Sequence, residues 1–325
     1  MGIAIRIHET GAPEVLRVEQ HDPGQPGTGE VLIRHEAIGL NYIDVYHRSG
    51  LYPLSELPAV IGMEGAGVVE SIGSGVTDLN LGDRVAYAGL PPGAYAERRC
   101  IPAHRVVKLP KGISTAQAAA IMLKGMTARY LLFGCYPVKI GDTILIHAAA
   151  GGVGSLVCQW AHHLGATVIG TVGSEAKAAY VSERGCDHPV LYQKEDFVEK
   201  VMALTSGKGV DVVYDSVGQA TFERSLRCLR PLGTMVSFGQ SSGPVAPLDL
   251  GKLAAYGSLF LTRPTLMTYT ARREDLLVHA EDLFDVVIKG AVRVEINQEF
   301  ALKDAVRAHQ VLESRGTMGS SLLLP

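Results

Sequence analysis

The sequence has few cysteines and no large excess of charge of either sign. Its 325 residues include five cysteines, none of them in a Cys-X-X-Cys pair, and the formal net charge is −3. An odd, scattered set of cysteines argues against a disulfide framework and favours a reducing, cytoplasmic compartment. The small negative charge offers no basic surface to a phosphodiester backbone, so nucleic acid is not the expected partner.

Long hydrophobic runs are missing as well. No uncharged apolar stretch reaches the roughly 18 residues of a membrane span, and the opening MGIAIRIHETG lacks the apolar core and cleavage site of a signal peptide. We therefore expect no membrane partner. What the chain does have is 47% hydrophobic residues, which over this length suffices for about two domains with buried cores.

The first third of the chain has no helical periodicity before about residue 114. It contains instead short β-type runs separated by turn signals, at Ile3–Ile7, Val31–Ala37, Gly65–Ile72 and Arg84–Ala88. This pattern predicts a β-rich, partly barrel-like domain.

A different pattern begins at Ser114, which can form a capping box with Gln117 at the start of a helix. Strands are then expected at Thr143–Ala148, Thr167–Val172, His188–Leu191, Val210–Asp215, Thr234–Phe238 and Ser258–Thr262, and helices between them at Gly152–Leu164, Glu175–Arg184, Phe197–Thr205 and Thr221–Leu229. This alternation is typical of βαβ units in a parallel sheet.

The alternation stops at about residue 264. Helices at Arg273–Lys289 and Leu302–Glu313 and a strand at Ser321–Leu324 are expected to rejoin the first domain. The predicted division is therefore residues 1–125 with 264–325 for the β-rich domain, and 126–263 for the parallel-sheet domain.

The strongest chemical signal is the segment Ala149-Ala150-Gly151-Gly152-Val153-Gly154, which lies between a predicted strand and a predicted helix. It is the dinucleotide fingerprint G-x-G-x-x-G with Ala149 in place of the first glycine. Gly151 lets the backbone approach a pyrophosphate, Gly154 lets helix and strand pack closely, and the helix N-terminus offers free N–H groups. A glycine-rich turn without a ligand is the alternative interpretation.

The end of the second strand of this unit has no carboxylate where an NAD site usually carries one for the ribose 2′-hydroxyl. Gly173 and Ser174 follow that strand, Lys177 lies one turn into the next helix, and Tyr192 ends the next strand. A hydroxyl, a helix N-terminus and an ammonium suit a 2′-phosphate, so the pattern predicts NADPH. Glu175 is the competing candidate, as a ribose-binding acid shifted in register.

Several segments together resemble a known family. They are Ala37–Tyr46, Arg48–Tyr52, Gly62–Val69, Gly82–Val85, Lys124–Ala128, the glycine turn, Asp215–Gly218 and Ser237–Gly239. Over nearly its full length the chain resembles the zinc-independent medium-chain dehydrogenases/reductases, in the quinone oxidoreductase group that includes zeta-crystallin. The resemblance implies an α/β fold with a Rossmann doubly wound parallel sheet, a β-rich GroES-like catalytic domain, and an active site in the cleft between them.

The resemblance also implies that no metal is bound. Asn41 stands where the zinc-dependent relatives carry a cysteine ligand, and Met63 replaces the histidine before Glu64. An amide and a thioether are poor ligands for a catalytic Zn²⁺. The family commonly forms homodimers through the edges of its Rossmann sheets, for which Ser258–Thr262 is the candidate edge, unless this segment is an internal strand.

The resemblance places Asn41, Asp44, Tyr46 and Tyr52 around the substrate end of the cleft. Further cofactor candidates come from the ends of the later strands, because ligands in open α/β sheets bind outside the strand carboxyl ends. The predicted catalytic residues are Asn41, Asp44, Tyr46, Tyr52 and Thr127. The predicted cofactor-binding residues are Asn41, Tyr42, Ile43, Lys124, Thr127, Tyr130, Ala150, Gly151, Gly152, Val153, Gly173, Ser174, Lys177, Tyr192, Ser216, Phe238, Gly239, Gln240, Ser241, Arg263, Pro264 and Arg315.

Structural roles are the alternative for several of these residues. Asp44 could bond nearby backbone, the tyrosines could be partly buried aromatics, Lys124 and Arg315 could be surface charges, and Arg263 could form a salt bridge. His147, His162, His163 and Cys158 are interpreted as structural.

The predicted function is metal-free reduction of a quinone by NADPH. Reduction of the C=C bond of an enone or alkenal is the first alternative. The others are an RNA-binding or structural zeta-crystallin-like role and an NADPH sensor without catalysis.

Overall fold

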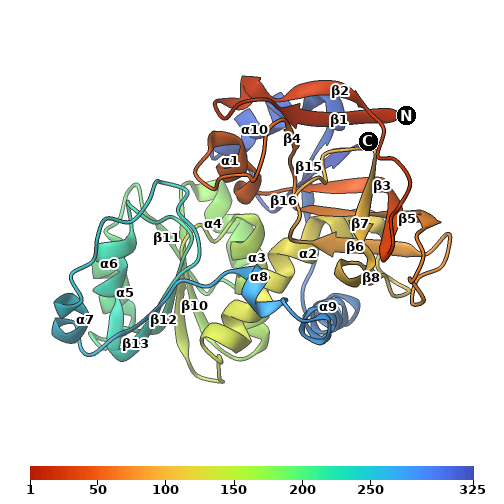
Figure 1. Ribbon diagram of the computed structural model, residues 1–325. Coiled ribbons are helices and arrows are strands. Elements are labelled where there is room, and N and C mark those ends of the chain that lie inside the picture. The colour runs from red at the N-terminus through yellow and green to blue at the C-terminus, as the bar shows by residue number, and fades with distance from the viewer. The chain divides into compact units, whose positions relative to one another are not determined.

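The computed structural model describes all residues from Met1 to Pro325 and divides into two compact units. Unit 1 comprises residues 1–126, 270–288 and 294–325, and unit 2 comprises residues 127–269 and 289–293. Both are drawn in Figure 1. The central segment of unit 2 is therefore supplemented by a short piece of chain from near the C-terminus.

Unit 2 is built on a six-stranded sheet in which every neighbouring pair is parallel. The strands are β9 (Thr143–Ile146), β10 (Thr167–Val172), β11 (His188–Leu191), β12 (Val210–Asp215), β13 (Leu229–Ser237) and β14 (Phe260–Thr262), in the spatial order β11-β10-β9-β12-β13-β14. This is the order of a Rossmann sheet. The sequence of strands runs outward in opposite senses from β9 and β12, and such sheets bind ligands at this switch point. The predicted parallel sheet is confirmed.

Helices lie on both faces of this sheet (Figure 1). The helices that pack on its strands are α3 (Gly152–His163), α4 (Glu175–Ser182), α5 (Phe197–Leu204) and α6 (Phe222–Leu226). Unit 2 also contains the short helices α7 (Gly251–Ala255) and α8 (Leu266–Tyr269). The apolar stripe on α3 is buried as its spacing predicts, with Leu156, Val157 and Trp160 all less than 5% exposed. Burial of both faces explains why the strands are almost continuously apolar.

Unit 1 contains two sheets. β1 (Gly2–Ile7) pairs with β2 (Arg17–His21) and β4 (Ala59–Val60). The larger sheet runs β15 (Ile296–Ala301), β16 (Ser320–Leu324), β3 (Glu30–Leu40), β5 (Glu64–Ile72), β6 (Arg84–Ala88) and β8 (Val107–Lys108), and β7 (Arg98–Pro102) also pairs with β3. β16 pairs with β3 in the antiparallel orientation. The C-terminal segment therefore completes the sheet formed by the N-terminal third.

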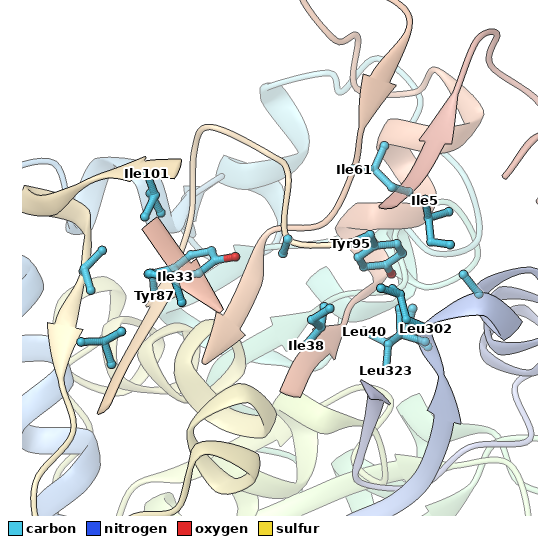
Figure 2. Close-up of a cluster of buried hydrophobic side chains, with 14 of the residues drawn as sticks. Ile5, Ile33, Ile38, Leu40, Ile61, Tyr87, Tyr95, Ile101, Leu302 and Leu323 are labelled. Carbon is cyan, nitrogen blue, oxygen red and sulfur yellow. The ribbon is translucent and has the colours of Figure 1, made fainter. Parts of the chain in front are cut away.

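A cluster of buried side chains fills the interior of unit 1 (Figure 2). It joins Ile5 of β1, Leu40 of β3, Tyr95 of the loop before β7, Leu302 of the 3-10 turn Leu302–Asp304, and Leu323 of β16. Tyr95 is completely buried there.

The remaining helices are α1 (Tyr42–Ser49), α2 (Thr115–Tyr130), α9 (Arg273–Ile288) and α10 (Ala305–Glu313), and a π-helical turn at Leu131–Cys135 follows α2. The predicted capping box at α2 is confirmed, since Ser114 N–H donates to Gln117 Oε1 at 3.0 Å and Gln117 N–H donates to Ser114 Oγ at 3.1 Å. None of the helices has the length and hydropathy needed to span a bilayer.

The expectation that no helix precedes residue 114 is wrong, because α1 begins at Tyr42. This helix has only eight residues, too few to repeat an apolar spacing. Its end signals are clear, however: Asp44 Oδ2 accepts the Asn41 N–H at 2.9 Å, and Gly50 ends the helix in a left-handed conformation with φ 83°. The sequence patterns also do not predict strands β2, β4, β7, β8 and β15.

Candidate active site

The start of α3 in unit 2 forms a cradle of backbone. Gly151 is the N-cap, and because it has no side chain, no side-chain oxygen takes up the first N–H groups of α3. A methyl group on Gly154 would overlap the Ala148 carbonyl oxygen, and one on Gly151 would lie 3.2 Å from the same oxygen. The turn therefore leaves free donors and a positive helix end in a space that only glycine allows.

Four residues lie together at the end of β10. Ser174 is the N-cap of α4, and its hydroxyl accepts the Lys177 N–H at 3.3 Å. The Tyr192 hydroxyl lies over Gly173, at 2.9 Å from where a Cβ would stand. Lys177 is half-buried, and burial lowers the pKa of its ammonium. This corner thus combines two hydroxyls, a helix N-terminus and a cation, without a carboxylate on the strand end itself.

Glu175, the competing candidate, is engaged elsewhere. Its Oε1 accepts a bond from Lys194 Nζ at 2.7 Å, and both side chains are largely exposed. An exposed pair of this kind contributes little to stability, but it directs the carboxylate toward Lys194.

The ends of β12 and β13 bring the next predicted group together. Asp215, fully buried, accepts N–H bonds from Val217 at 2.7 Å and Gly218 at 3.0 Å, which shapes the turn containing Ser216. Ser241 N–H donates to Ser216 O at 3.1 Å, so the two strand ends are adjacent. Arg263 NH1 donates to the carbonyl of Ser237 at 2.8 Å and that of Gly239 at 3.3 Å. Arg263 thus supports the loop that carries Phe238, Gly239, Gln240 and Ser241.

Thr127 and Tyr130 lie on the unit 2 part of α2. Tyr130 is buried, and its ring stacks on that of Tyr269 with centroids 4.7 Å apart and planes 9° apart. Burial raises the pKa of the Tyr130 phenol, while a hydrogen bond with Thr127 lowers it. The two predicted residues are therefore in direct contact.

In unit 1 the predicted residues Asn41 and Lys124 meet at Glu64. Asn41 Nδ2 donates to Glu64 Oε2 at 2.8 Å, and Lys124 Nζ donates to the same oxygen at 3.0 Å. Leu123 N–H donates to Glu64 Oε1 at 2.6 Å. Glu64 is completely buried and Lys124 is 5% exposed, so Lys124 is no surface charge. Three donors compensate the buried carboxylate, and the bond from Asn41 fixes the orientation of its amide.

Asp44 is completely buried beside this group. Its Oδ2 accepts the Asn41 N–H at 2.9 Å and the Tyr95 hydroxyl at 3.1 Å, whereas its Oδ1 has no hydrogen-bond partner. Burial raises the pKa of the Asp44 carboxyl to about 7, against the hydrogen bonds from Asn41 and Tyr95 and the charge of Lys124, which lower it. Asp44 therefore changes charge near neutral pH.

The tyrosines of α1 and the following loop form a run of ring contacts. Tyr46 contacts Tyr42 at 5.6 Å between centroids and Tyr52 at 5.0 Å. Tyr46 is buried, whereas Tyr42, Ile43 and Tyr52 are half-buried, and burial raises the pKa of the Tyr42 phenol. Arg315 lies after α10 with φ 59°. The planes of neighbouring rings are inclined by 62° and 58°, so a planar ligand could stack on the exposed face of a single half-buried ring.

Comparison with known proteins bears on both units. Residues 27–111 match the family model described as alcohol dehydrogenase GroES-like domain, and residues 152–276 match the one described as zinc-binding dehydrogenase. The chain is 50% identical to quinone oxidoreductase of Pseudomonas aeruginosa and 48% identical to quinone oxidoreductase 1 of Escherichia coli, with complete coverage of both proteins in each case. The chain belongs to the quinone oxidoreductase family.

Solved structures of this family have the same fold. The Escherichia coli quinone oxidoreductase complexed with NADPH superimposes with a TM-score of 0.98 at 48% identity, covering 99% of this chain and 100% of that one. A 2-haloacrylate reductase gives a TM-score of 0.88 at 45% identity, covering 99% of each chain. The predicted family and fold class are confirmed.

The zinc named in the family model does not fit the residues of this quinone oxidoreductase family member. Asn41 and Met63 are not zinc ligands of the usual kind, and Glu64 already accepts a bond from the Lys124 ammonium, which repels a divalent cation. No group of three His, Cys, Asp or Glu side chains is placed to hold a metal ion. We derive no step through a metal.

Glu64, Tyr95 and His309 were not predicted as site residues, although each supports one that was. Glu64 had a sequence signal: it is a lone carboxylate within the small and apolar segment Gly62–Val69, and a buried charge needs a partner. Tyr95 and His309 gave no such signal, because their contacts depend on chain segments far apart in the sequence.

Proposed function

We propose that this chain is an NADPH-dependent quinone reductase that needs no metal. The observation that carries the proposal is the corner at the end of β10, where Ser174, Lys177 and Tyr192 gather. The strand end itself has no carboxylate, and Glu175 in the first turn of α4 is paired with Lys194. This arrangement favours the extra 2′-phosphate of NADPH, which a carboxylate would repel. Two relatives, the Escherichia coli quinone oxidoreductase and a mycobacterial protein, have been solved in complex with NADPH.

Each part of the cofactor has candidate residues in the chain. The pyrophosphate would bind Ala150, Gly151, Gly152 and Val153, and the 2′-phosphate would bind Gly173, Ser174, Lys177 and Tyr192. The remaining contacts would come from Asn41, Tyr42, Ile43, Lys124, Thr127, Tyr130, Ser216, Phe238, Gly239, Gln240, Ser241, Arg263, Pro264 and Arg315. Bound NADPH supplies a hydride, so the protein's task is to hold and orient the two reactants.

The acceptor would be oriented by Asn41, Tyr46, Tyr52 and Thr127. The half-buried ring of Tyr52, which contacts the buried ring of Tyr46, would pack against a planar quinone. Phenol or amide groups would stabilise the oxygen as negative charge develops on it. Asp44, whose side chain is completely buried, acts in this proposal by holding the backbone of Asn41.

The second candidate activity is reduction of a C=C bond. It is favoured by one observation, the 45% identity to a relative named 2-haloacrylate reductase from a Burkholderia species. The same delivery of hydride could reduce an alkene activated by a carbonyl group. The physiological acceptor is therefore an oxidised small molecule of one of these two classes.

Steady-state kinetics with p-benzoquinone, a naphthoquinone and an alkenal, each with NADPH and with NADH, test the proposal. We expect the highest kcat/KM for a quinone with NADPH. Faster turnover of the alkenal than of every quinone would transfer the assignment to the second candidate. Tight RNA binding at physiological salt without NADPH oxidation would favour a binding role, and NADPH binding without turnover of any acceptor would favour a sensor.

We also infer a homodimer formed through β14, which ends the unit 2 sheet with an unpaired edge. Phe260 and Leu261 on this strand are 61% and 37% exposed, which is unusual for large apolar residues on an edge strand. Light scattering should give a dimer mass for the wild type and a monomer mass for Leu261→Lys. Ile140→Lys, at an exposed apolar residue elsewhere in unit 2, is the matched control.

A further inference from the structure

A chain of buried hydrogen bonds in unit 1 ends at Asp44. The Tyr95 hydroxyl lies 3.1 Å from Asp44 Oδ2 and 3.0 Å from His309 Nε2. His309 Nδ1 lies 3.1 Å from Arg48 NH1, and Arg48 makes two further bonds to Glu313 at 2.8 and 2.9 Å. This series of hydrogen bonds connects the loop before β7, α10 and both ends of α1. Its members lie far apart in the sequence.

The direction of these bonds follows from the chemistry of the groups. Arg48 can only donate, so His309 Nδ1 must accept, and the ring proton lies on Nε2. That proton is donated to the Tyr95 oxygen, which leaves the Tyr95 hydroxyl proton for Asp44 Oδ2. Burial and the charge of Arg48 lower the pKa of His309 to about 3, so the ring stays neutral and this order holds at all ordinary pH values.

The bonds run through a dry interior. Asp44, Tyr95 and His309 are fully buried and Arg48 is 2% exposed. Figure 2 shows Tyr95 within the apolar cluster of unit 1. Because water cannot replace these partners, the hydroxyl of Tyr95 has a large influence on the carboxyl that it contacts.

Other charged groups also act on Asp44. Lys124 of α2 favours its ionised form, Glu64 of β5 opposes it, and the Asn41 N–H at the start of α1 favours it. Tyr95 is the neutral side-chain donor among these groups, and its hydrogen bond can be removed by deleting one oxygen atom. The contribution of Tyr95 can therefore be measured without changing any charge.

We propose that Tyr95 and His309 are positioning residues of the acceptor end of the active site, which hold the Asp44 carboxylate against the Asn41 N–H and thereby fix the first turn of α1. The effect of this positioning on the catalytic rate rests on the proposed function. The ionised Asp44 accepts both donors, whereas the protonated form holds Asn41 and Tyr95 more weakly. The catalytic rate therefore depends on Asp44 being ionised.

The Tyr95→Phe variant tests the hydrogen-bond series because it removes only the hydroxyl that bonds to Asp44. Without this donor the pKa of Asp44 should rise by about one unit. NMR titration of the Asn41 amide proton, which is bonded to Asp44, should show its midpoint moving upward by that amount. The acid limb of kcat should move by the same amount, so kcat falls several-fold at pH 7 and recovers at pH 9, while the KM for NADPH changes less than twofold.

His309→Leu and His309→Gln form a second pair, which also tests the chain if Tyr95→Phe does not fold. Leucine leaves Arg48 and Tyr95 without their partner. The midpoint of the Asn41 amide titration should then move upward by less than it does in Tyr95→Phe. Glutamine can accept from Arg48 and donate to Tyr95, so it should restore most of the wild-type profile. His163→Gln, at an exposed histidine of α3, serves as the unrelated control.

An Asn41 midpoint that does not move in Tyr95→Phe would overturn the proposal, as would a loss of kcat equal at every pH. Equal behaviour of His309→Leu and His309→Gln would also overturn it. The NMR titration needs no turnover, so wild-type protein that oxidises no NADPH would contradict the proposed function while the titration still decides the positioning role.

Discussion

At the start of α3 in unit 2, glycines and free backbone N–H groups form the candidate phosphate site, whereas the candidate acceptor residues of unit 1 rest on buried polar side chains. Gly151 and Gly154 contribute by lacking a side chain. Glu64, Lys124 and Asp44 contribute charges that are almost completely buried.

The difference has an energetic meaning. A backbone cradle is part of the secondary structure, and its donors stay solvated until a ligand arrives. A buried charge must instead be compensated inside the protein at all times. Damage in unit 2 should therefore weaken binding of the nucleotide, while damage in unit 1 should destabilise the fold or change its dependence on pH.

The largest effect should come from Lys124→Met, which removes the cation 3.0 Å from Glu64 Oε2. The buried carboxylate keeps only the neutral donors Asn41 and Leu123, so the free energy of unfolding should fall by about 3–5 kcal/mol. Urea denaturation measures this change.

The double variant Glu64→Gln/Lys124→Met is the matched control. With both charges removed, at least half of the lost stability should return. A single variant as stable as the wild type, or a double variant less stable than Lys124→Met, would contradict the view that Lys124 compensates Glu64.

The pH dependence of stability should change in Asp44→Asn. Because the pKa of Asp44 is raised to about 7 from its ordinary value of 3.8, the folded state holds a proton that the unfolded state has released between these pH values. The Asp44 contribution to the free energy of unfolding therefore falls as pH rises through this window, by about 1.4 kcal/mol per unit at most.

Buried histidines act in the opposite direction. Burial lowers the pKa of His35 to about 4 and, with Arg48, that of His309 to about 3, so stability is lost as pH falls below about 6.5. The informative quantity is thus the difference between wild type and Asp44→Asn, measured by urea denaturation from pH 5 to 8. Asp44→Asn should gain stability relative to the wild type as pH rises, and a difference independent of pH would refute the raised pKa.

The same contrast explains which features the sequence predicts. The turn Ala149–Gly154 and the group around Ser174 lie within short, continuous segments whose spacing repeats a known geometry. The strands of the parallel sheet and most helices of unit 2 follow from the alternation of apolar runs, whereas the spatial order of the strands does not. The bonds of unit 1 join Glu64 to Lys124 across 60 positions and Tyr95 to His309 across 214 positions, and no local pattern specifies such pairs.

Helix α1 illustrates the same limit on a smaller scale. Its eight residues contain β-branched and aromatic side chains that favour strands, so propensity argued against a helix. The capping bond of Asp44 and the left-handed conformation of Gly50 instead fix the start and the end of this helix. Motif resemblance predicted Asn41 and Asp44, but it did not indicate that Asp44 is buried or that Tyr95 and His309 support it.

Gly154→Ala should break the backbone cradle. The added methyl group would overlap the Ala148 carbonyl and lie 2.8 Å from Ala149 Cα. We expect a stability loss of about 1–3 kcal/mol from overpacking and a dissociation constant for NADPH raised about tenfold. Fluorescence titration with NADPH measures the second effect. Gly151→Ala, with a contact of 3.2 Å, should show a smaller change, and equal effects of the two variants would argue against a steric cause.

The smallest effect should come from Lys177→Gln, which tests how unit 2 distinguishes the two nucleotides. Loss of one charge-assisted bond to a 2′-phosphate should weaken NADPH binding about tenfold and leave NADH binding unchanged. Lys194→Gln removes a different lysine, which pairs with Glu175, and should alter neither affinity. If Glu175 were the ribose-binding acid, Glu175→Gln would weaken NADH binding and Lys177→Gln would affect both nucleotides equally. Calorimetric titration of the three variants with both nucleotides therefore separates the two interpretations.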